Sequence, residues 1–357
     1  MSVQLREIVE NFPKLLTLVR GSSNFTVAEL QAPSTGNAKS LIFIANALHL
    51  KEAKESQGVA WVVHKDLVNS VPESVPIVLS SPNVQLAMSS VGVKFFPLTR
   101  HFQPIEGPKI HPSAHIAKSA KIGAGCIIGP GVTIGEDVEL GEGCILGANC
   151  VIEPDVKIGA RTHLHPLVFI GHSCVIGKEC EVHPNSTIGS EGFGYSRDEA
   201  FNQYRITHYG KVILEDRVHI GANVSLDRGT FLDSRIGAGT KIDNHCHLGH
   251  NFVIGKNCLV TAGFIAAGSV TIGDYCAFGG RTSVTGHLDI VSKVQISGLS
   301  GVSKSIDKPG EYGGFPLQPL RDSIKSRAAI RHLPELLSNV RKIMKHLGLE
   351  PAEKPAE

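Results

Sequence analysis

The sequence predicts a mainly β protein built around a left-handed parallel β-helix, with a small N-terminal α/β domain and C-terminal helices. The main observation is an apolar residue at every sixth position from Ile110 to Ile296, with only two breaks in phase. A six-residue period matches no α-helix and is typical of a parallel β-helix, in which three short strands with their turns close one coil. Glycine follows many of these apolar residues, as in Ile122-Gly123.

The two phase breaks divide the repeat into frames that run from Ile110 to Ile188, from Leu214 to Leu232 and from Ile236 to Ile296. The first break, between Ile188 and Leu214, is more than four times as long as the single hexad that would join these positions. An insertion at about 190–210 must therefore leave the stack, and such insertions often line a binding face. The second break shifts the frame by four residues and predicts a distorted corner.

The chain on either side of the repeat follows other patterns. Residues 1–105 are predicted to form the α/β domain, with a short amphipathic helix at 3–9 and strands at 40–45 and 58–63. The β-helix, with its inserted loop, is expected over residues 106–313.

Residues 314–357 are expected to form a helical extension, because the apolar period there becomes helical. One helix is predicted from Leu320 to Ile330 and another from Leu336 to Met344, with Pro334 between them. Charge alone leaves two interpretations of these helices open: a solvated face or oligomer bundle, and a docking surface for an acidic partner. The basic side chains concerned are Arg321, Lys325, Arg327, Arg331, Arg341, Lys342 and Lys345.

Composition excludes several classes of protein. The formal net charge of +2 gives no global field that points to nucleic acid. No apolar run approaches the roughly 18 residues of a membrane span, and no signal-peptide pattern is present, so we expect a cytoplasmic protein without an integral membrane segment. Each cysteine lies two residues before an inward apolar position, so all eight are predicted to be small core residues: Cys126, Cys144, Cys150, Cys174, Cys180, Cys246, Cys258 and Cys276.

Histidines are frequent in the repeat and raise the question of a metal site. A zinc site needs three or four ligands that converge at one point, as in the gamma-class carbonic anhydrases. The histidines here are scattered over different faces and coils, so we predict no metal site. They are His163, His165, His172, His183, His219, His245, His247, His250 and His287.

The repeat also predicts which residues lie near His250. Gly268 follows His250 by three hexads, or one coil, and its backbone is therefore expected almost directly beyond the imidazole. His287 is about two coils away and one residue over, roughly 10 Å from His250. Asp243 precedes His250 by seven residues and lies around a corner, so contact between the two would need a subunit interface. His250 is a candidate catalytic base, and the alternative is an ordinary surface histidine.

At these residues the chain resembles the UDP-3-O-(3-hydroxyacyl)glucosamine N-acyltransferase family of lipid A biosynthesis. The resemblance covers nearly the whole chain, and the N-terminal domain distinguishes this family from the related O-acyltransferases. The most specific matching segments are IGSEGFGY (188–195), SLDRG (225–229), IDNHCHLGHN (242–251), AAGS (266–269), VTGH (284–287) and GFPLQP (314–319).

The resemblance implies a role for each residue of the candidate active site. His250 corresponds to the general base, Asp243 to the carboxylate that orients it, and the Gly268 amide to the donor for the oxyanion. His287 corresponds to a second active-site histidine, and Asn251, in the same segment as His250, is assigned to substrate binding.

The resemblance also implies residues for substrate recognition. In the N-terminal domain the uridine part of the substrate is expected at Phe43, Asn46 and His49, where His49 replaces the tyrosine of the family pattern. Lys304 occupies a position near the acyl channel where some members carry arginine, and it keeps the charge without the fork-shaped guanidinium.

The implied reaction transfers a 3-hydroxyacyl group from acyl carrier protein to the 2-amine of a UDP-3-acyl-glucosamine, with no cofactor. The resemblance implies a homotrimer with active sites between neighbouring β-helices, and it favours carrier-protein docking for the basic helices. Two other classes stay open: a different β-helix enzyme, such as a zinc hydratase, and a non-enzymatic scaffold.

Overall fold

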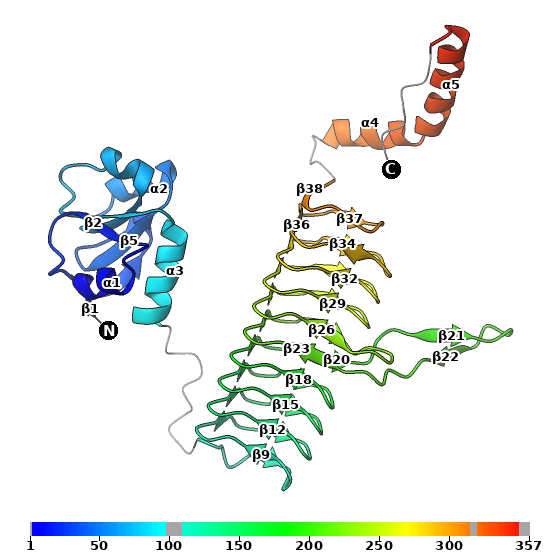
Figure 1. Cartoon of the computed structure of the whole chain (residues 1–357), viewed down its shortest axis with the longest axis horizontal. Coiled ribbons are helices and arrows are strands. Elements are labelled where there is room, and N and C mark those ends of the chain that lie inside the picture. Colours follow the sequence, from blue (N-terminus) through cyan, green and yellow to red (C-terminus); the bar gives the residue numbers. More distant parts are fainter. Residues whose placement is uncertain (1, 98–108, 315–319, 350–357) are drawn as a thin grey trace. The chain divides into compact units, whose positions relative to one another are not determined.

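The computed structural model describes residues 2–97, 109–314 and 320–349. The chain forms two compact units, Met1–Gln103 and Pro104–Glu357. The second unit contains a parallel β-helix (Figure 1), so the predicted fold class is confirmed. The predicted boundary at 105/106 and most of the GFPLQP segment lie outside the described residues.

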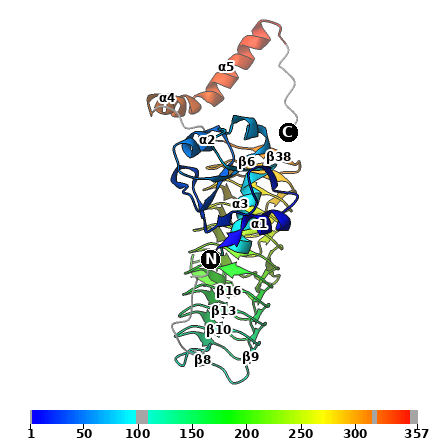
Figure 2. The same ribbon diagram turned by 90° about the vertical axis from the view of Figure 1, so that its left-hand side faces the viewer.

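Three parallel sheets form the walls of the β-helix, and we call them faces 1, 2 and 3. Strands that are three hexads apart pair in register, as Ile128 does with Leu146 and Leu146 with Leu164. Figure 2 shows β10, β13 and β16 of face 1 stacked one above another. Each apolar hexad residue therefore lies on its counterpart one coil away, at the strand spacing of about 4.8 Å.

The strands of the β-helix are short, and most contain two residues. Face 1 comprises β10 (Ile127–Ile128), β13 (Ile145–Leu146), β16 (His163–Leu164), β19 (Glu181–Val182), β24 (His219–Ile220), β27 (Lys241–Ile242), β30 (Leu259–Val260), β33 (Ala277–Phe278), β36 (Val294–Ile296) and β38 (Gly310–Tyr312). Face 2 comprises β8 (His115–Ile116), β11 (Thr133–Ile134), β14 (Val151–Ile152), β17 (Phe169–Ile170), β20 (Thr187–Ser190), β25 (Ser225–Asp227), β28 (His247–Leu248), β31 (Ile265–Ala266), β34 (Ser283–Val284) and β37 (Gly301–Val302). Face 3 comprises β9 (Lys121–Ile122), β12 (Glu139–Leu140), β15 (Lys157–Ile158), β18 (Val175–Ile176), β23 (Val212–Leu214), β26 (Ser234–Ile236), β29 (Val253–Ile254), β32 (Thr271–Ile272) and β35 (Asp289–Ile290).

One apolar core runs the length of the β-helix, and all eight cysteines are buried in it as free thiols. Their Sγ atoms donate to carbonyl oxygens of the neighbouring coil, as Cys144 does to Gly159 at 3.2 Å. Burial raises the pKa of the Cys144 and Cys150 thiols to about 11. The prediction that the cysteines are core residues is therefore confirmed.

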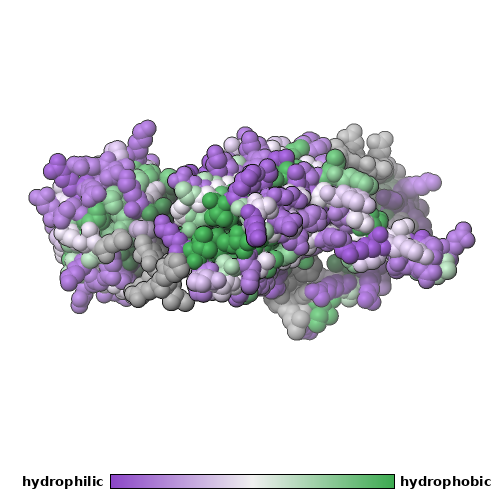
Figure 3. Space-filling view, turned by 90° about the horizontal axis from the view of Figure 1, so that it is seen from below, coloured by the Kyte–Doolittle hydropathy of each residue, from purple (hydrophilic) through white to green (hydrophobic). Residues whose placement is uncertain are grey.

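The first coil leaves part of the apolar core exposed. Ile110 is 42% exposed, and Ile116 and Ile122 are only partly buried. Figure 3, seen from below, shows apolar surface gathered at this end of the β-helix. Within the described residues no coil precedes the first hexads, which explains why they are less buried than the later ones.

The first phase break contains a hairpin that leaves the stack (Figure 1). Its strands are β21 (Tyr195–Arg197) and β22 (Gln203–Arg205), which pair in antiparallel fashion. Across the break, Val175 of β18 pairs with Ile213 of β23, so the β-helix continues after the insertion without losing a strand.

At the second break the predicted frame is wrong at one position. Leu214 pairs with Ile236, so this coil is four residues longer than three hexads, and the extra residues bulge outward between β25 and β26. Leu232, expected to point inward, is 77% exposed, whereas Arg228 is buried. The distorted corner was predicted correctly, but the bulge moves Leu232 out of the core.

The first unit contains a five-stranded sheet in the order β2-β7-β6-β5-β4, with an apolar cluster on each side. The predicted strands correspond to β5 and β6. The predicted helix at 3–9 is partly wrong, because Val3 and Gln4 pair with Val27 and Thr26 before the helix begins. The elements are β1 (Val3–Gln4), α1 (Leu5–Asn11), β2 (Thr17–Arg20), β3 (Thr26–Val27), β4 (Glu29–Gln31), η1 (Pro33–Thr35), β5 (Ser40–Ile44), α2 (Ala47–Lys54), β6 (Ala60–His64), η2 (Lys65–Ser70), β7 (Ile77–Ser81) and α3 (Val84–Phe95).

Two helices, α4 (Leu320–Ile330) and α5 (Leu333–His346), follow the β-helix. Pro334, expected between the helices, lies instead in the first turn of α5, where the missing N–H of proline costs no hydrogen bond. Within the described ranges, no helix has the length and apolar character that a bilayer crossing requires.

Candidate active site

The His250 imidazole lies directly over the backbone of Gly268. Leu248 and Ala266 pair in register, two residues before each of them, and the Ser269 N–H donates to the His250 carbonyl at 2.8 Å. A Cβ atom added to Gly268 would lie 2.5 Å from His250 Nε2. Only glycine leaves room for this ring at position 268, and the stacking agrees with the one-coil spacing of the two residues.

Lys304 belongs to the same column of corner residues. Val284 pairs with Ala266, and Val302 pairs with Val284. The residues two positions later are therefore stacked in the order His250, Gly268, Gly286, Lys304. The backbones of His250 and Lys304 are about 14 Å apart along this column. Because the two residues between them are glycines, no side chain of this column lies between His250 and the exposed Lys304.

His287 occupies the adjacent column of the same corner. Its N–H donates to the Gly268 carbonyl at 3.1 Å, and its side chain is exposed. The position two coils from His250 and one residue over agrees with the spacing of the repeat. His287, Ser269 and Asn251 all have a φ near +60°, which marks the left-handed turn of this corner.

The Asn251 side chain holds the His250 ring and the distorted corner together. Its Oδ1 accepts the Thr230 N–H at 3.0 Å, and its Nδ2 donates to the Leu232 carbonyl at 3.2 Å. Both partners are backbone groups, so the orientation of the amide is determined. His250 Nδ1 lies 3.1 Å from Asn251 Oδ1. Because Oδ1 only accepts, Nδ1 carries the proton and the lone pair of the imidazole is on Nε2.

Asp243 does not contact His250 within one chain. Its carboxylate accepts the Asn244 N–H at 2.7 Å and the Ala262 N–H at 3.2 Å, and it follows a strand of face 1. His250 follows a strand of face 2. The two residues are at different corners, as the seven-residue spacing predicts.

His208, from the end of the insertion, packs against His250. The ring centroids are 5.3 Å apart, and His208 is 3% exposed. Neither of its ring nitrogens has a hydrogen-bond partner within the described part of the chain. Burial, followed by the proximity of His250, lowers the pKa of His208, so its imidazole is neutral near pH 7. His208 is not predicted by the repeat, because the hexad frame does not extend into the insertion.

A groove of about 540 Å³ lies between the insertion and face 2. Asp227 is buried in its wall, accepts a hydrogen bond from Ser190 Oγ at 2.9 Å and lies 3.9 Å from His247 Nε2. Burial raises the pKa of the Asp227 carboxyl. Asp227 is within the SLDRG segment, but nothing in that spacing predicted its proximity to the insertion. Phe193 and Arg205 contribute the opposite wall.

Three residues were expected to bind uridine, and the structure shows where each of them lies in the N-terminal fold. The Phe43 side chain is packed in the core beneath the sheet and is only 6% exposed. The Asn46 side chain caps α2 by accepting the His49 N–H at 2.9 Å. The Nδ1 atom of His49 is buried without a hydrogen-bond partner in the described chain. A uridine site at these positions stays a prediction.

The view that the histidines are scattered is wrong for four of them. His163, His165, His183 and His219 gather around Glu181 on face 1. Glu181 and His219 are separated in sequence by the whole insertion but pair in register, because the insertion leaves the stack. Because the insertion separates Glu181 from His219 in the sequence, the repeat alone did not predict that these side chains are neighbours.

Comparison with known proteins gives full-length relatives. The chain is 35% identical to the UDP-3-O-acylglucosamine N-acyltransferase of Herminiimonas arsenicoxydans over 98% of this chain and 99% of the relative. It is 38% identical to the protein of the same name from Methylococcus capsulatus over 97% and 98% of the two chains. A family model described as the GMPPB C-terminal domain matches residues 110–191, which are the first coils of the β-helix.

Comparison of structures supports the fold. The crystal structure of an Arabidopsis UDP-N-acetylglucosamine acyltransferase superimposes with a TM-score of 0.52 at 25% identity. The match covers 57% of this chain and 71% of the Arabidopsis chain.

Proposed function

This chain belongs to the UDP-3-O-acylglucosamine N-acyltransferase family and is an N-acyltransferase, and we propose that His250 is the general base of its reaction. The acyl acceptor in this proposal is the 2-amine of a UDP-3-acyl-glucosamine, and the donor is a 3-hydroxyacyl thioester of acyl carrier protein. The product is an intermediate of lipid A biosynthesis, made in the cytoplasm without a cofactor. The observation that carries the proposal is the His250 ring stacked over the Gly268 backbone.

The amine must lose a proton as it attacks the thioester carbonyl carbon. The bond to Asn251 leaves the lone pair on His250 Nε2, the atom that lies over Gly268. A neutral imidazole accepts a proton efficiently near pH 7. The buried neutral His208 shields the other side of the ring from water without adding a positive charge.

The tetrahedral intermediate places a negative charge on the former carbonyl oxygen. The Gly268 N–H makes no hydrogen bond to another described residue, so it is available to donate to this oxygen. A backbone amide already in position stabilises the oxyanion without reorganisation. Collapse of the intermediate forms the amide bond and breaks the carbon–sulfur bond, and the departing thiolate takes the proton held by His250.

The glycine column offers a path for the donor thioester. Gly268 and Gly286 present no side chains between His250 and Lys304, so an extended pantetheine arm fits along the corner beside them. Lys304 provides a positive charge about 14 Å from the base, which suits a phosphate group at the far end of that arm. His287, exposed in the adjacent column, is placed to contact either the arm or the sugar.

A homotrimer completes the site in this proposal. The carboxylate of Asp243 is at another corner, so it reaches an imidazole only across an interface between chains. Helix α5 carries exposed Leu336, Leu337, Val340 and Ile343, an apolar stripe that favours packing between copies. The basic side chains of both helices then remain for the acidic carrier protein.

The N-terminal unit is proposed to bind the uridine part of the acceptor at Phe43, Asn46 and His49. Phe43 would have to become exposed for its ring to stack on the base, because it is packed in the core. His49 Nδ1, buried and unpartnered within the described chain, is the atom best suited to meet a polar edge of the nucleotide.

Mass spectrometry of the reaction product tests the proposed function. The full chain is incubated with 3-hydroxyacyl carrier proteins of several chain lengths and the UDP-3-acyl-glucosamine. The expected product is heavier by one hydroxyacyl group, and fragmentation places that group on the 2-nitrogen. Acyl transfer to an oxygen instead of the 2-nitrogen, or no product with any of these donors, would contradict the proposed acceptor and donor.

A further inference from the structure

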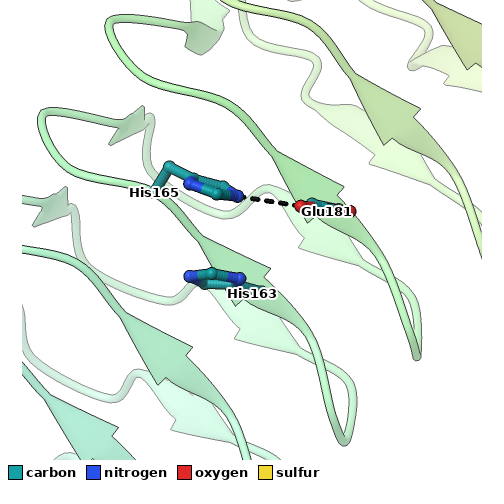
Figure 4. A group of neighbouring side chains, drawn as sticks. All are labelled: His163, His165 and Glu181. Carbon is teal, nitrogen blue, oxygen red and sulfur yellow. Dashed lines mark hydrogen bonds and ion pairs between the residues drawn. The ribbon is translucent and has the colours of Figure 1, made fainter. Parts of the chain in front are cut away.

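A cluster of histidine and glutamate side chains lies on face 1, separate from the column of His250. His163 of β16 and Glu181 of β19 are register partners on successive coils. His165 is two residues beyond His163, and Figure 4 shows its ring directed toward Glu181 and lying over the His163 ring. One ligand atom from each lies within 4.8 Å of the other two.

This cluster is partly shielded from water. The His165 side chain is 12% exposed and that of Glu181 is 35% exposed. His165 Nε2 and Glu181 Oε1 are 2.9 Å apart, and His183 Nε2 lies 3.4 Å from the same oxygen. The His165 ring is stacked between those of His163 and His183, with centroid separations of 4.1 and 4.4 Å.

The Glu181 carboxylate supplies the oxygen ligand of this cluster, and His165 Nε2 and His183 Nε2 both approach its Oε1 atom. A carboxylate beside imidazoles is an available metal ligand, since only the imidazoles must be free of their second proton before they coordinate an ion.

We propose that His163, His165 and Glu181 bind a divalent transition-metal ion of the Zn²⁺ type. Two imidazole nitrogens and one carboxylate oxygen form a ligand set that Zn²⁺ accepts, with the fourth position left for water. Zinc–nitrogen bonds of about 2.0–2.1 Å bring tetrahedral ligand atoms to roughly 3.3 Å from one another. The present separations need to shorten by at most about 1.5 Å. One stacked ring must turn about its Cβ–Cγ bond, a torsion with broad minima.

An ion at this site would cross-link two successive coils just before the inserted hairpin. The cluster is on a different face from His250, so the ion would take no part in the acyl transfer proposed at His250. His183, whose Nε2 lies 3.4 Å from Glu181 Oε1, would hold that carboxylate in place as an outer partner.

Zn²⁺ and Co²⁺ titrations of the full chain, without an affinity tag, test this proposal. The expected result is one ion per chain, a Co²⁺ absorption spectrum typical of tetrahedral coordination, and a thermal-unfolding midpoint that rises with Zn²⁺ concentration. The variants Glu181→Gln and His165→Gln should each bind Zn²⁺ at least ~10-fold more weakly, since loss of an outer partner alone costs that much. A matched control is His115→Gln, at an exposed histidine on face 2.

Circular dichroism establishes that each variant is folded before its affinity is compared. The control should bind Zn²⁺ as the unmodified chain does, and acyl transfer is not the readout. Equal affinity in both cluster variants and the unmodified chain, or the absence of saturable binding at one equivalent, would overturn the proposal and assign any bound ion to scattered surface histidines.

Discussion

His250 and Gly268 are stacked on successive coils so closely that a Cβ atom at position 268 would lie 2.5 Å from the His250 Nε2 atom. This contact joins the proposed base to the proposed oxyanion donor through the geometry of the repeat itself. The strand spacing of the β-helix sets their separation, so neither residue depends on a mobile loop for its position relative to the other.

Replacement of Gly268 by alanine should displace the imidazole and reduce kcat by ~10²-fold or more, because a shift of about 1 Å in a catalytic group has an effect of that size. The backbone at Gly268 is not left-handed, so alanine introduces a steric effect rather than backbone strain. Steady-state kinetics of Gly268→Ala measure it. The control Gly92→Ala, in helix α3, where the nearest atom to an added Cβ is Leu30 Cδ1 at 3.7 Å, should keep normal turnover, and equal losses in both variants would contradict a specific contact with His250.

The bond between Asn251 and His250 predicts a shift in the pH profile. In Asn251→Asp a carboxylate replaces the amide oxygen next to His250 Nδ1 and stabilises the imidazolium. The acidic limb of the kcat/KM profile should therefore move up by about one pH unit or more. Asn257→Asp, at a comparable left-handed corner with φ +52°, is the control and should leave the profile unchanged. An unshifted limb in Asn251→Asp would argue against His250 as the titrating base.

Acid should loosen the insertion through His208. Burial lowers the pKa of His208 in the packed state, whereas an undocked imidazole titrates near 6.5. The undocked form therefore binds more protons below pH 6.5, and the free energy of docking decreases as the pH falls from that value toward the lowered pKa. Hydrogen exchange of residues 191–208, corrected for its intrinsic pH dependence, should report opening that increases up to ~10-fold per pH unit.

The variant His208→Leu provides the comparison for this pH dependence. It keeps an apolar group in the buried position but has no titrating imidazole. Its insertion should open to the same extent at pH 5.5 and 7.5. Acid-dependent opening that persists in this variant would assign the effect to other groups, of which Glu191 and Asp227 are the nearest acidic ones.

The corrected frame at the second phase break predicts that alanine substitutions at two leucines change the free energy of unfolding by different amounts. Leu226 is fully buried, so Leu226→Ala should lower the free energy of unfolding by about 2–5 kcal/mol. Leu232 is 77% exposed, so Leu232→Ala should change it by less than ~0.5 kcal/mol. Urea unfolding measures both. Similar decreases in the free energy of unfolding of the two variants would indicate that Leu232 is a core residue.

The regular part of the fold was predictable because every hexad repeats the same local rule. That rule determined the inward positions, the burial of the cysteines, the stacking of His250 over Gly268 and the place of His287 in the adjacent column. It failed where the chain leaves the repeat. The bulge that exposes Leu232 and buries Arg228 depends on local packing that a period of six does not contain.

Residues brought together by the insertion were the hardest to predict. His208 contacts His250 only because the end of the insertion, after the hairpin, returns to the β-helix beside it. The pairing of Glu181 with His219 is obscured by the same insertion, which made the histidines of face 1 look unrelated. Asn251 was expected to bind substrate, and its bonds to Thr230 and Leu232 follow from the distorted corner rather than from the repeat.

Turnover of the His250→Ala variant tests the central claim most directly. Product is quantified by mass spectrometry with saturating acyl carrier protein thioester and UDP-3-acyl-glucosamine, and the oligomeric state and unfolding midpoint of the variant are compared with those of the unmodified chain. Loss of the base should reduce kcat by ~10²–10⁴-fold while the assembly stays intact. Turnover within a few-fold of normal in a correctly assembled variant would contradict the account and remove His250 from the mechanism.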